Sequence, residues 1–185
     1  MRRIVLTFGL IAGGLLSLMM LGNMLVVDRI GFDHGEVIGY TTMVLAFLLV
    51  YFGIRSYRDN VAGGTVGFGR ALAVGLLIVL VASACYVATW EVEYFALFPD
   101  FADKYAAHVI ERARAAGASP AELDARIREM EQFRVMYRNP LINVAYTFLE
   151  PLPVGLPFAL VSAGILSRRR RRNDSLALDE ARAAG

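Results

Sequence analysis

Apolar residues form four long runs along the chain, and charged residues are gathered in the segments between them. A membrane-spanning helix needs about 20 mostly apolar residues. The runs are close to this length, so they predict four membrane helices, at residues 4–27, 37–54, 71–90 and 141–166. The fourth run contains three prolines, and prolines inside a helix disfavour a continuous hydrogen-bond ladder.

The first run also resembles a secretory signal peptide, because Arg2 and Arg3 precede it. Its charge-free stretch from Ile4 to Val27 is longer than the core of a typical signal peptide. No clear cleavage motif of small residues follows the run. We therefore interpret it as an uncleaved membrane helix.

The charges between the runs predict the orientation of the chain. Basic residues beside membrane helices favour the cytoplasmic side. They precede the first helix, flank the connection between the second and third helices, and follow the fourth, at Arg2 and Arg3, at Arg55, Arg58 and Arg70, and at Arg168 to Arg172. Acidic residues outnumber basic ones in residues 28–36 and 91–140. Four helices with both termini in the cytoplasm satisfy every connection.

Residues 100–138 have a regular pattern that predicts helices. Apolar residues recur at helical spacing over residues 100–116, and Gly117 is suited to end that helix. Residues 119–122 then have the sequence of a capping box, with proline at the first helical position. We expect an extracytoplasmic, amphipathic helical hairpin. Its apolar face would cover its own bundle, the lipid surface or another membrane or periplasmic protein.

Composition agrees with a membrane protein of one domain. Of 185 residues, 57% are hydrophobic and 19% are charged, and the mean hydropathy is +0.51. We expect an all-α integral membrane four-helix bundle over residues 1–167, then a basic stop and a mobile cytoplasmic tail over residues 168–185. The arginine block is also typical of nucleic-acid binding, but it abuts an apolar run and has no interleaved aromatic residues. We therefore expect the lipid bilayer, and no nucleic acid, as its partner.

Glu150 is the most unusual residue of the apolar runs. A charge inside a bilayer costs at least about 2.5–3.5 kcal/mol, so it must be paired, hydrated or protonated. Counting back from the inner end of the fourth run at 1.5 Å per residue places Glu150 roughly 24 Å from the inner boundary. Glu91 and Glu93 end the third helix on the same side, so the three carboxylates are expected to converge. Arg138 and Arg29 are the candidate partners.

Two interpretations of these carboxylates stay open. In the structural one, Glu150 pairs with an arginine or caps a helix end. In the functional one, the carboxylates form an outward-facing site for a cation or a proton.

No other residues indicate catalysis, a metal or a cofactor. His34 and His108 are isolated, and with the single Cys85 they make no zinc pattern. The glycine-rich residues 63–69 lack the Lys-Ser/Thr ending of a phosphate-binding loop, so we expect a flexible turn there. No serine, threonine or cysteine has an identifiable base partner, and we expect no enzymatic activity, no metal and no cofactor.

Small residues at four-residue spacing line one face of several membrane helices and allow close helix contact. In the first helix they are Gly9, Gly13 and Ser17. Packing within the chain explains such a face, and a homodimer formed through it is the alternative.

Several stretches carry a family resemblance. They are residues 53–59, 64–70, 86–94 with Trp90 and Glu91, 98–101 with Lys104 and Tyr105, 136–140, and 147–150 followed by 153–155. Together they resemble the bacterial membrane proteins grouped as domain of unknown function 4199, over roughly Gly9 to Leu166. The resemblance implies a small multi-pass protein of the bacterial inner membrane and brings no established activity.

Three polar residues within the resembling stretches lie at the inner end of the second helix. Arg55, Tyr57 and Arg58 are candidates for contact with anionic lipid headgroups, which attract juxtamembrane basic residues by about 1 kcal/mol each. The alternative is that the arginines only set the topology.

Three functions are compatible with these patterns. The first is a non-enzymatic accessory membrane protein that binds a partner through the hairpin. The second is a small transporter or a proton- or cation-coupled channel subunit that uses Glu150, Glu91 and Glu93. The third is a membrane enzyme acting on a lipid-linked substrate with these carboxylates as acid and base.

Overall fold

The chain is all-α in its computed structural model, which describes the backbone of residues 1–183 and the side chains of residues 1–167 except Asp28. Within that part no strand is present, which confirms the predicted fold class at this level. The helices are α1 (Arg2–Ile30), α2 (Phe32–Asn60), α3 (Phe68–Val92), the π-helical η1 (Glu93–Leu97), α4 (Phe101–Ala115), α5 (Pro120–Tyr137), α6 (Pro140–Leu149) and α7 (Leu152–Ala183).

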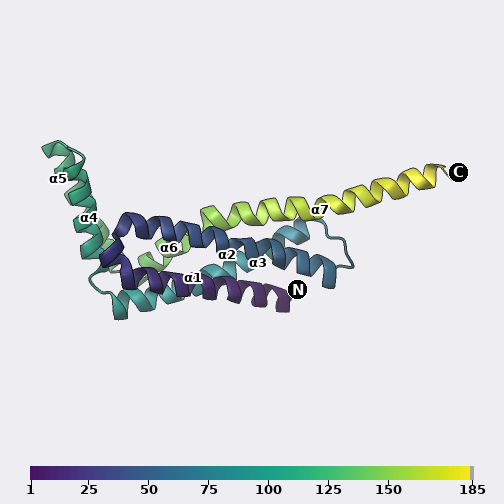
Figure 1. Cartoon of the computed structure of the whole chain (residues 1–185), viewed down its shortest axis with the longest axis horizontal. Coiled ribbons are helices and arrows are strands. Elements are labelled where there is room, and N and C mark those ends of the chain that lie inside the picture. The colour runs from purple at the N-terminus through teal and green to yellow at the C-terminus, as the bar shows by residue number, and fades with distance from the viewer. Residues whose placement is uncertain (184–185) are drawn as a thin grey trace.

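Four helical segments among the described residues are long and apolar enough to cross a membrane, as predicted. They are Arg2–Val27, Phe32–Asn60, Phe68–Leu97 and Pro140–Ser167. They run side by side along the long axis of the molecule, and the N-terminus lies at the same end as the connection between α2 and α3 (Figure 1). The spans are longer than the apolar runs because each helix continues into polar flanking residues.

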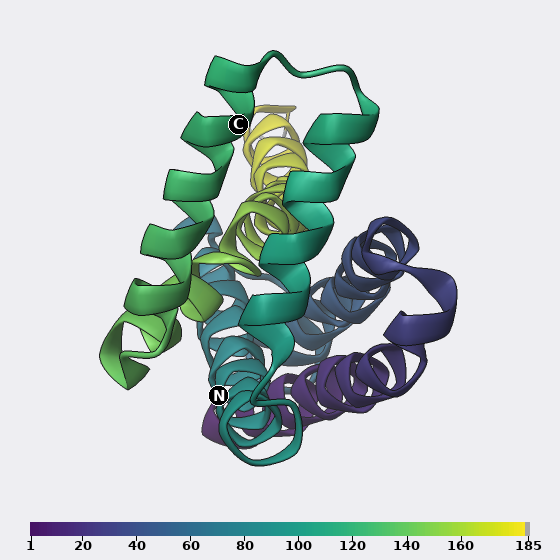
Figure 2. The same cartoon turned by 90° about the vertical axis from the view of Figure 1, so that its left-hand side faces the viewer.

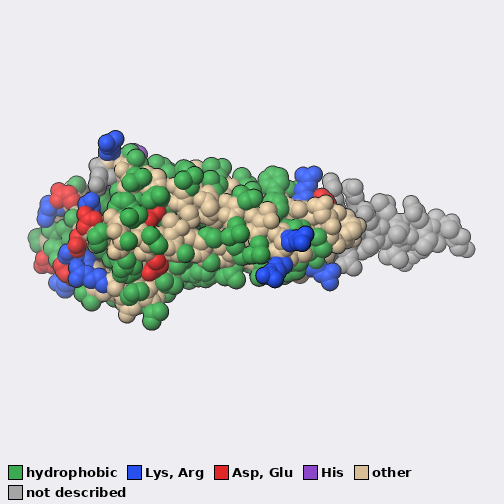
Figure 3. Space-filling model, turned by 90° about the horizontal axis from the view of Figure 1, so that it is seen from below, with side chains coloured by type: hydrophobic (Ala, Val, Ile, Leu, Met, Phe, Trp, Pro, Cys, Tyr) green, Lys and Arg blue, Asp and Glu red, His purple; other side chains and the backbone are tan. Residues whose placement is uncertain are grey.

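α3 is the centre of the bundle and packs against α1, α2 and α7. Its small and branched side chains meet those of its neighbours in a fully buried core that includes Ile54, Ile78, Ala82, Ala159 and Ala163. Outside this core, large apolar side chains such as Leu18, Leu25 and Val37 are about two-thirds exposed. Figure 3 shows apolar side chains over the middle of the molecule, with charged groups gathered towards the ends. An apolar exterior between charged ends fits lipid as the surrounding solvent.

The fourth span is broken, as its prolines predicted. α6 ends at Leu149 and α7 begins at Leu152, with Glu150 and Pro151 between them. Pro151 and Pro153 have no N–H groups to donate, so the hydrogen-bond ladder stops there. The helix resumes with the bond from the Gly155 N–H to the Pro151 carbonyl, at 2.8 Å. The break places Glu150 at a helix end inside the span.

α4 and α5 form the predicted hairpin. Ser119 and Glu122 make the full capping box, and Gly117 ends the preceding turn with φ of 80°. The hairpin lies across one end of the bundle (Figures 1 and 2). Its apolar face packs on the protein itself through aromatic pairs, with 4.8 Å between the ring centroids of Phe101 and Trp90 and 5.2 Å between those of Tyr137 and Tyr94.

α7 continues to Ala183. The side chains of Arg168 to Arg172 lie outside the described residues. The prediction of a mobile tail over residues 168–185 stays a prediction.

Candidate functional site

A cavity of about 430 Å³ lies between the hairpin and the nearby ends of the membrane helices. Side chains from α1, α2, α3, α4, α5 and α6 line it, together with Glu150 at the break before α7. Most of the lining is aromatic or apolar, including four methionines from α1 and α2. Ligand pockets are typically about 300–1,000 Å³, mostly apolar, with a few convergent polar groups, and this cavity has that character.

Glu150 faces the cavity. The Tyr86 hydroxyl donates a hydrogen bond to its Oε2 atom at 3.1 Å. Although Glu150 lies within a membrane span, its side chain keeps accessible surface because it opens onto the cavity. The helix break therefore serves to place a carboxylate where water or a ligand reaches it.

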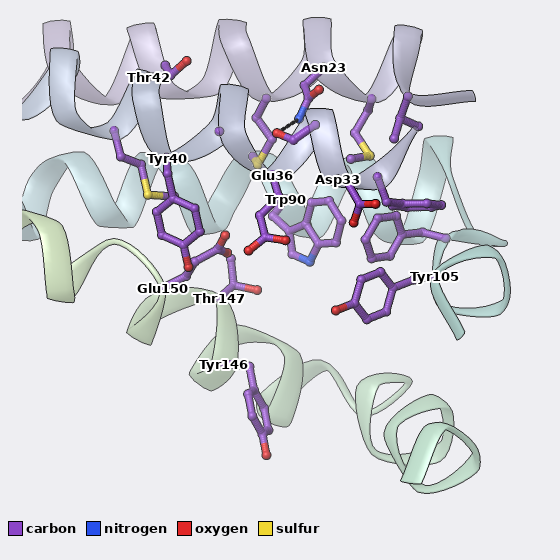
Figure 4. Close-up of a pocket in the computed structure, with 18 of the residues that line it drawn as sticks. Asn23, Asp33, Glu36, Tyr40, Thr42, Trp90, Tyr105, Tyr146, Thr147 and Glu150 are labelled. Atoms are coloured by element: carbon purple, nitrogen blue, oxygen red, sulfur yellow. Dashed lines mark hydrogen bonds between the residues drawn. The ribbon is translucent and has the colours of Figure 1, made fainter. Parts of the chain in front are cut away.

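Glu36 is the second carboxylate of the cavity. It lines the same cavity as Glu150 and Tyr40. Figure 4 shows Glu36 and Glu150 turned towards the same space, with the Tyr40 hydroxyl beside Glu150. The Asn23 side chain donates to the Gly35 carbonyl at 2.9 Å, which ties α1 to this turn of α2.

Glu36 was missed by the sequence analysis, which assigned it to an external connection. The structure starts α2 at Phe32, after a one-residue turn at Gly31 with φ of 81°. Asp33, Glu36 and Tyr40 then recur at spacings of three and four residues, which places them on one helical face. This spacing of polar residues at the start of an apolar helix is the sequence feature that could have indicated Glu36 as a site residue.

Trp90 forms part of the cavity wall. It is 6% exposed, and its indole N–H has no hydrogen-bond partner. In Figure 4 the indole nitrogen points into the space between Thr147 and Tyr105. The Thr147 hydroxyl is already directed to the Asn143 side-chain oxygen, at 3.2 Å. The indole nitrogen itself is shielded, and the Tyr137 hydroxyl lies close to it, so Trp90 contributes mainly its aromatic face to the wall.

An ion pair joins the hairpin to α2 on the Asp33 side of the cavity. Arg112 of α4 donates to Asp33 Oδ1 at 2.7 Å, and His108 Nε2 is 3.3 Å from the same oxygen. The Phe32 ring lies against His108, with 5.2 Å between ring centroids. Among the described residues, no ion pair involves Glu36 or Glu150. The positive charge of Arg112 is therefore directed to Asp33.

The predicted convergence of three carboxylates is wrong. Glu91 and Glu93 do not line the cavity, whereas Tyr86 and Trp90 of α3 do. Glu91 directly follows Trp90 and so points to another side of α3, and Glu93 begins η1, where the α-helical spacing ends. Glu93 is 1% exposed, and neither carboxylate oxygen has a hydrogen-bond partner. Glu91 is half-buried. The carboxylate that lines the cavity with Glu150 is Glu36 instead.

The predicted arginine partners of Glu150 are also wrong. Within the described part of the chain, neither Arg138 nor Arg29 forms an ion pair with it, and its hydrogen bond comes from Tyr86. The reason is geometric, since the helix break turns Glu150 inwards to α3.

Arg55, Tyr57 and Arg58, at the other end of α2, were candidates for contact with lipid headgroups. Two of these three side chains are buried in the protein. Tyr57 is 6% exposed and packs in the core. Arg58 is 5% exposed, and its Nε is 2.6 Å from Asp59. The Arg55 side chain is exposed, so the headgroup hypothesis is kept for Arg55 alone.

The face formed by Gly9, Gly13 and Ser17 is occupied by α3. A Cβ atom at Gly13 would lie 2.6 Å from the Cys85 Cβ atom, and one at Gly9 would lie 2.7 Å from the Val81 Cβ atom. The Thr89 hydroxyl donates to the Ser17 hydroxyl at 2.7 Å. This face packs within the chain, which corrects the alternative of a homodimer formed through it.

The described residues contain no group of three or more His, Cys, Asp or Glu side chains placed to hold a metal ion. A family model described as protein of unknown function (DUF4199) matches residues 7–168. Searches of curated proteins and of solved structures gave no match.

Proposed function

This chain belongs to the family described as protein of unknown function (DUF4199). From its geometry, we propose that it is a multi-pass membrane protein that binds a cation in the cavity. One observation supports the proposal above others. The cavity reaches Glu150, in the outer part of the fourth candidate span, and Glu36 lines it as well. A carboxylate inside an apolar span is costly without a compensating cation or proton. A cation supplies that compensation.

We place this protein in the bacterial inner membrane with both termini in the cytoplasm and the hairpin outside. The support is the charge distribution. The N-terminal arginines and the connection between α2 and α3 lie at one end of the bundle, and the hairpin lies at the other (Figure 1). The positive-inside rule then orients the molecule.

A cysteine at the hairpin tip tests this orientation. In a chain with Cys85→Ala, Ser119→Cys is expected to react with a membrane-impermeant maleimide added to intact cells whose outer envelope is permeable to it. The measurement is the mass shift of the purified protein, with Gly64→Cys, between α2 and α3, as the matched control that reacts only after lysis. If only Gly64→Cys were labelled in intact cells, the orientation of the protein would be the opposite of the one proposed.

The cavity favours cation binding over the other two functions. The hairpin directs Phe101, Tyr105 and Phe133 to the cavity, so its aromatic face is used within the chain. That leaves less support for a partner-binding hairpin. The acid–base set predicted for an enzyme is not assembled, because Glu91 and Glu93 do not line the cavity. We therefore propose a non-enzymatic protein of the transporter or channel-subunit class, with its site in the outer half of the membrane.

Carboxyl modification tests the proposed site directly. Dicyclohexylcarbodiimide reacts with protonated carboxyl groups in membranes, and peptide mass spectrometry gives the rate at each glutamate. In lipid nanodiscs, choline chloride is expected to slow modification of Glu150, because a bound cation keeps that carboxylate ionised and covered. Glu91 is the control within the same molecule, since salt screening acts on both residues. Equal rates at Glu150 with and without choline and sodium would exclude a cation site.

A further inference from the structure

We propose that the ligand of this cavity is an organic monocation with an apolar or aromatic body, which reaches the site sideways along α2. The inference rests on the proposed cation site and adds the chemical class of the ligand. It follows from the size of the cavity, its walls, its charges and the position of its opening.

The size and donor set of the cavity disfavour a bare metal ion. Calcium takes six to eight oxygen ligands at about 2.3–2.6 Å, and magnesium demands near-octahedral oxygen coordination. The inner part of this cavity offers two carboxylates and a few hydroxyls around a space of about 430 Å³. That space suits a molecule with many non-hydrogen atoms. An inorganic ion would have to keep its water shell.

The walls suit a cation with an apolar surface. Trp90, Tyr40, Tyr86 and Tyr137 lie around the carboxylates, and further aromatic rings come from α4, α5 and the start of α2. A cation is attracted to the face of an aromatic ring, and the attraction is stronger when both are shielded from water. Methionines on the α1 and α2 side adapt to an irregular apolar shape.

The charges favour one positive charge at the Glu150 end. Glu36 and Glu150 face each other, while Arg112 and His108 are held at Asp33. At the Glu150 end an anion would meet two carboxylates, while Arg112 and His108, which also line the cavity, are paired with Asp33. A monocation neutralises one of them, and a proton on the other completes the balance.

The opening lies on the side of the bundle. A second hollow adjoins the cavity and shares four of its lining residues with it, namely Asp33, Glu36, Tyr40 and Arg112. Its remaining lining is Val37 and Thr41, on the outer surface of α2, where Val37 is 68% exposed. This surface belongs to a membrane span, so an amphiphilic cation in the outer leaflet has direct access.

The single tryptophan of the chain reports on binding, because Trp90 is part of the wall. The full-length protein in nanodiscs is titrated with benzoylcholine while Trp90 fluorescence is recorded with excitation at wavelengths that the probe does not absorb. The matched neutral probe is 3,3-dimethylbutyl benzoate, in which carbon replaces the charged nitrogen. Tetramethylammonium and sodium chloride supply cations without an apolar body.

Benzoylcholine is expected to give a saturable change with a Kd at least about tenfold lower than that of the neutral probe or tetramethylammonium. Glu150→Gln is expected to remove this preference for charge, and Glu91→Gln, outside the cavity, is expected to keep it. Glu36→Gln supplies the same comparison if Glu150→Gln does not fold.

Each other outcome overturns the inference in a different way. Equal affinity for the neutral probe would refute the charged ligand class and leave a purely apolar site for these probes. A response to tetramethylammonium or sodium alone would keep the cation function and refute the apolar body. No saturable response to any probe would refute the ligand class, while protection of Glu150 from carbodiimide decides the cation site separately.

Discussion

Gly13→Leu is expected to destabilise the bundle by about 3 kcal/mol, whereas Gly14→Leu is expected to change its stability little. A Cβ atom at Gly13 would lie 2.6 Å from the Cys85 Cβ atom and 3.3 Å from the Ala82 Cα atom. The second of these is backbone, so α1 and α3 would have to separate. A Cβ atom at Gly14 meets nothing within 4 Å. The added side chain there would project from the bundle surface.

The measurement is thermal or denaturant unfolding of the two variants in the same detergent, with oligomeric state followed by light scattering. The two substitutions add the same atoms at neighbouring positions, so differences in helix propensity and hydrophobicity cancel. A homodimer built on this face would give a different result. Gly13→Leu would then dissociate the dimer while the monomer kept its stability.

Glu36→Lys is expected to abolish binding of benzoylcholine, with a loss of at least about 100-fold in affinity, while the protein becomes more stable. A lysine at this position faces Glu150, and the new pair neutralises the carboxylate that a ligand would otherwise compensate. A 100-fold loss of affinity corresponds to about 2.8 kcal/mol, which is within reach of replacing an attractive charge by a repulsive one beside the ligand. Gain of stability with loss of binding is the pattern of a functional site.

The Trp90 titration gives the affinity, and thermal unfolding without ligand gives the stability. Glu36→Gln is the intermediate control, because it removes the carboxylate without adding a positive charge. We expect its affinity to lie between those of the wild type and Glu36→Lys. Loss of stability in both variants, in proportion to loss of binding, would show instead that Glu36 and Glu150 serve the fold.

Much of the fold was predictable because its signals lie in contiguous residues. The number of spans follows from the length and hydropathy of each run. The hairpin follows from helical spacing, Gly117 and the capping box of Ser119 and Glu122, and all of these are present in the structure. The break near Glu150 follows from Pro151 and Pro153, since a missing N–H acts within one helical turn.

The site was only half predictable, for reasons that Glu91, Glu93 and Glu36 illustrate. Glu150 was found because a charge in an apolar run is visible in sequence. Glu91 and Glu93 were predicted to join it because they end α3 at the same membrane level. Level along the membrane normal does not determine which helical face a residue occupies, and the cavity receives Tyr86 and Trp90 from that helix instead.

The sequence by itself determined that the chain has four helices long and apolar enough to cross a membrane, a capped hairpin and an interruption in the fourth of these helices, because hydrophobic burial and helix capping act over a few neighbouring residues. Only the tertiary structure decided that Gly9 and Gly13 pack on α3 and that Glu36 faces Glu150 across an aromatic cavity. These contacts join helices that are distant in the chain. They depend on the rotation and register of each helix against its neighbours, which close packing selects only once all the helices are in place.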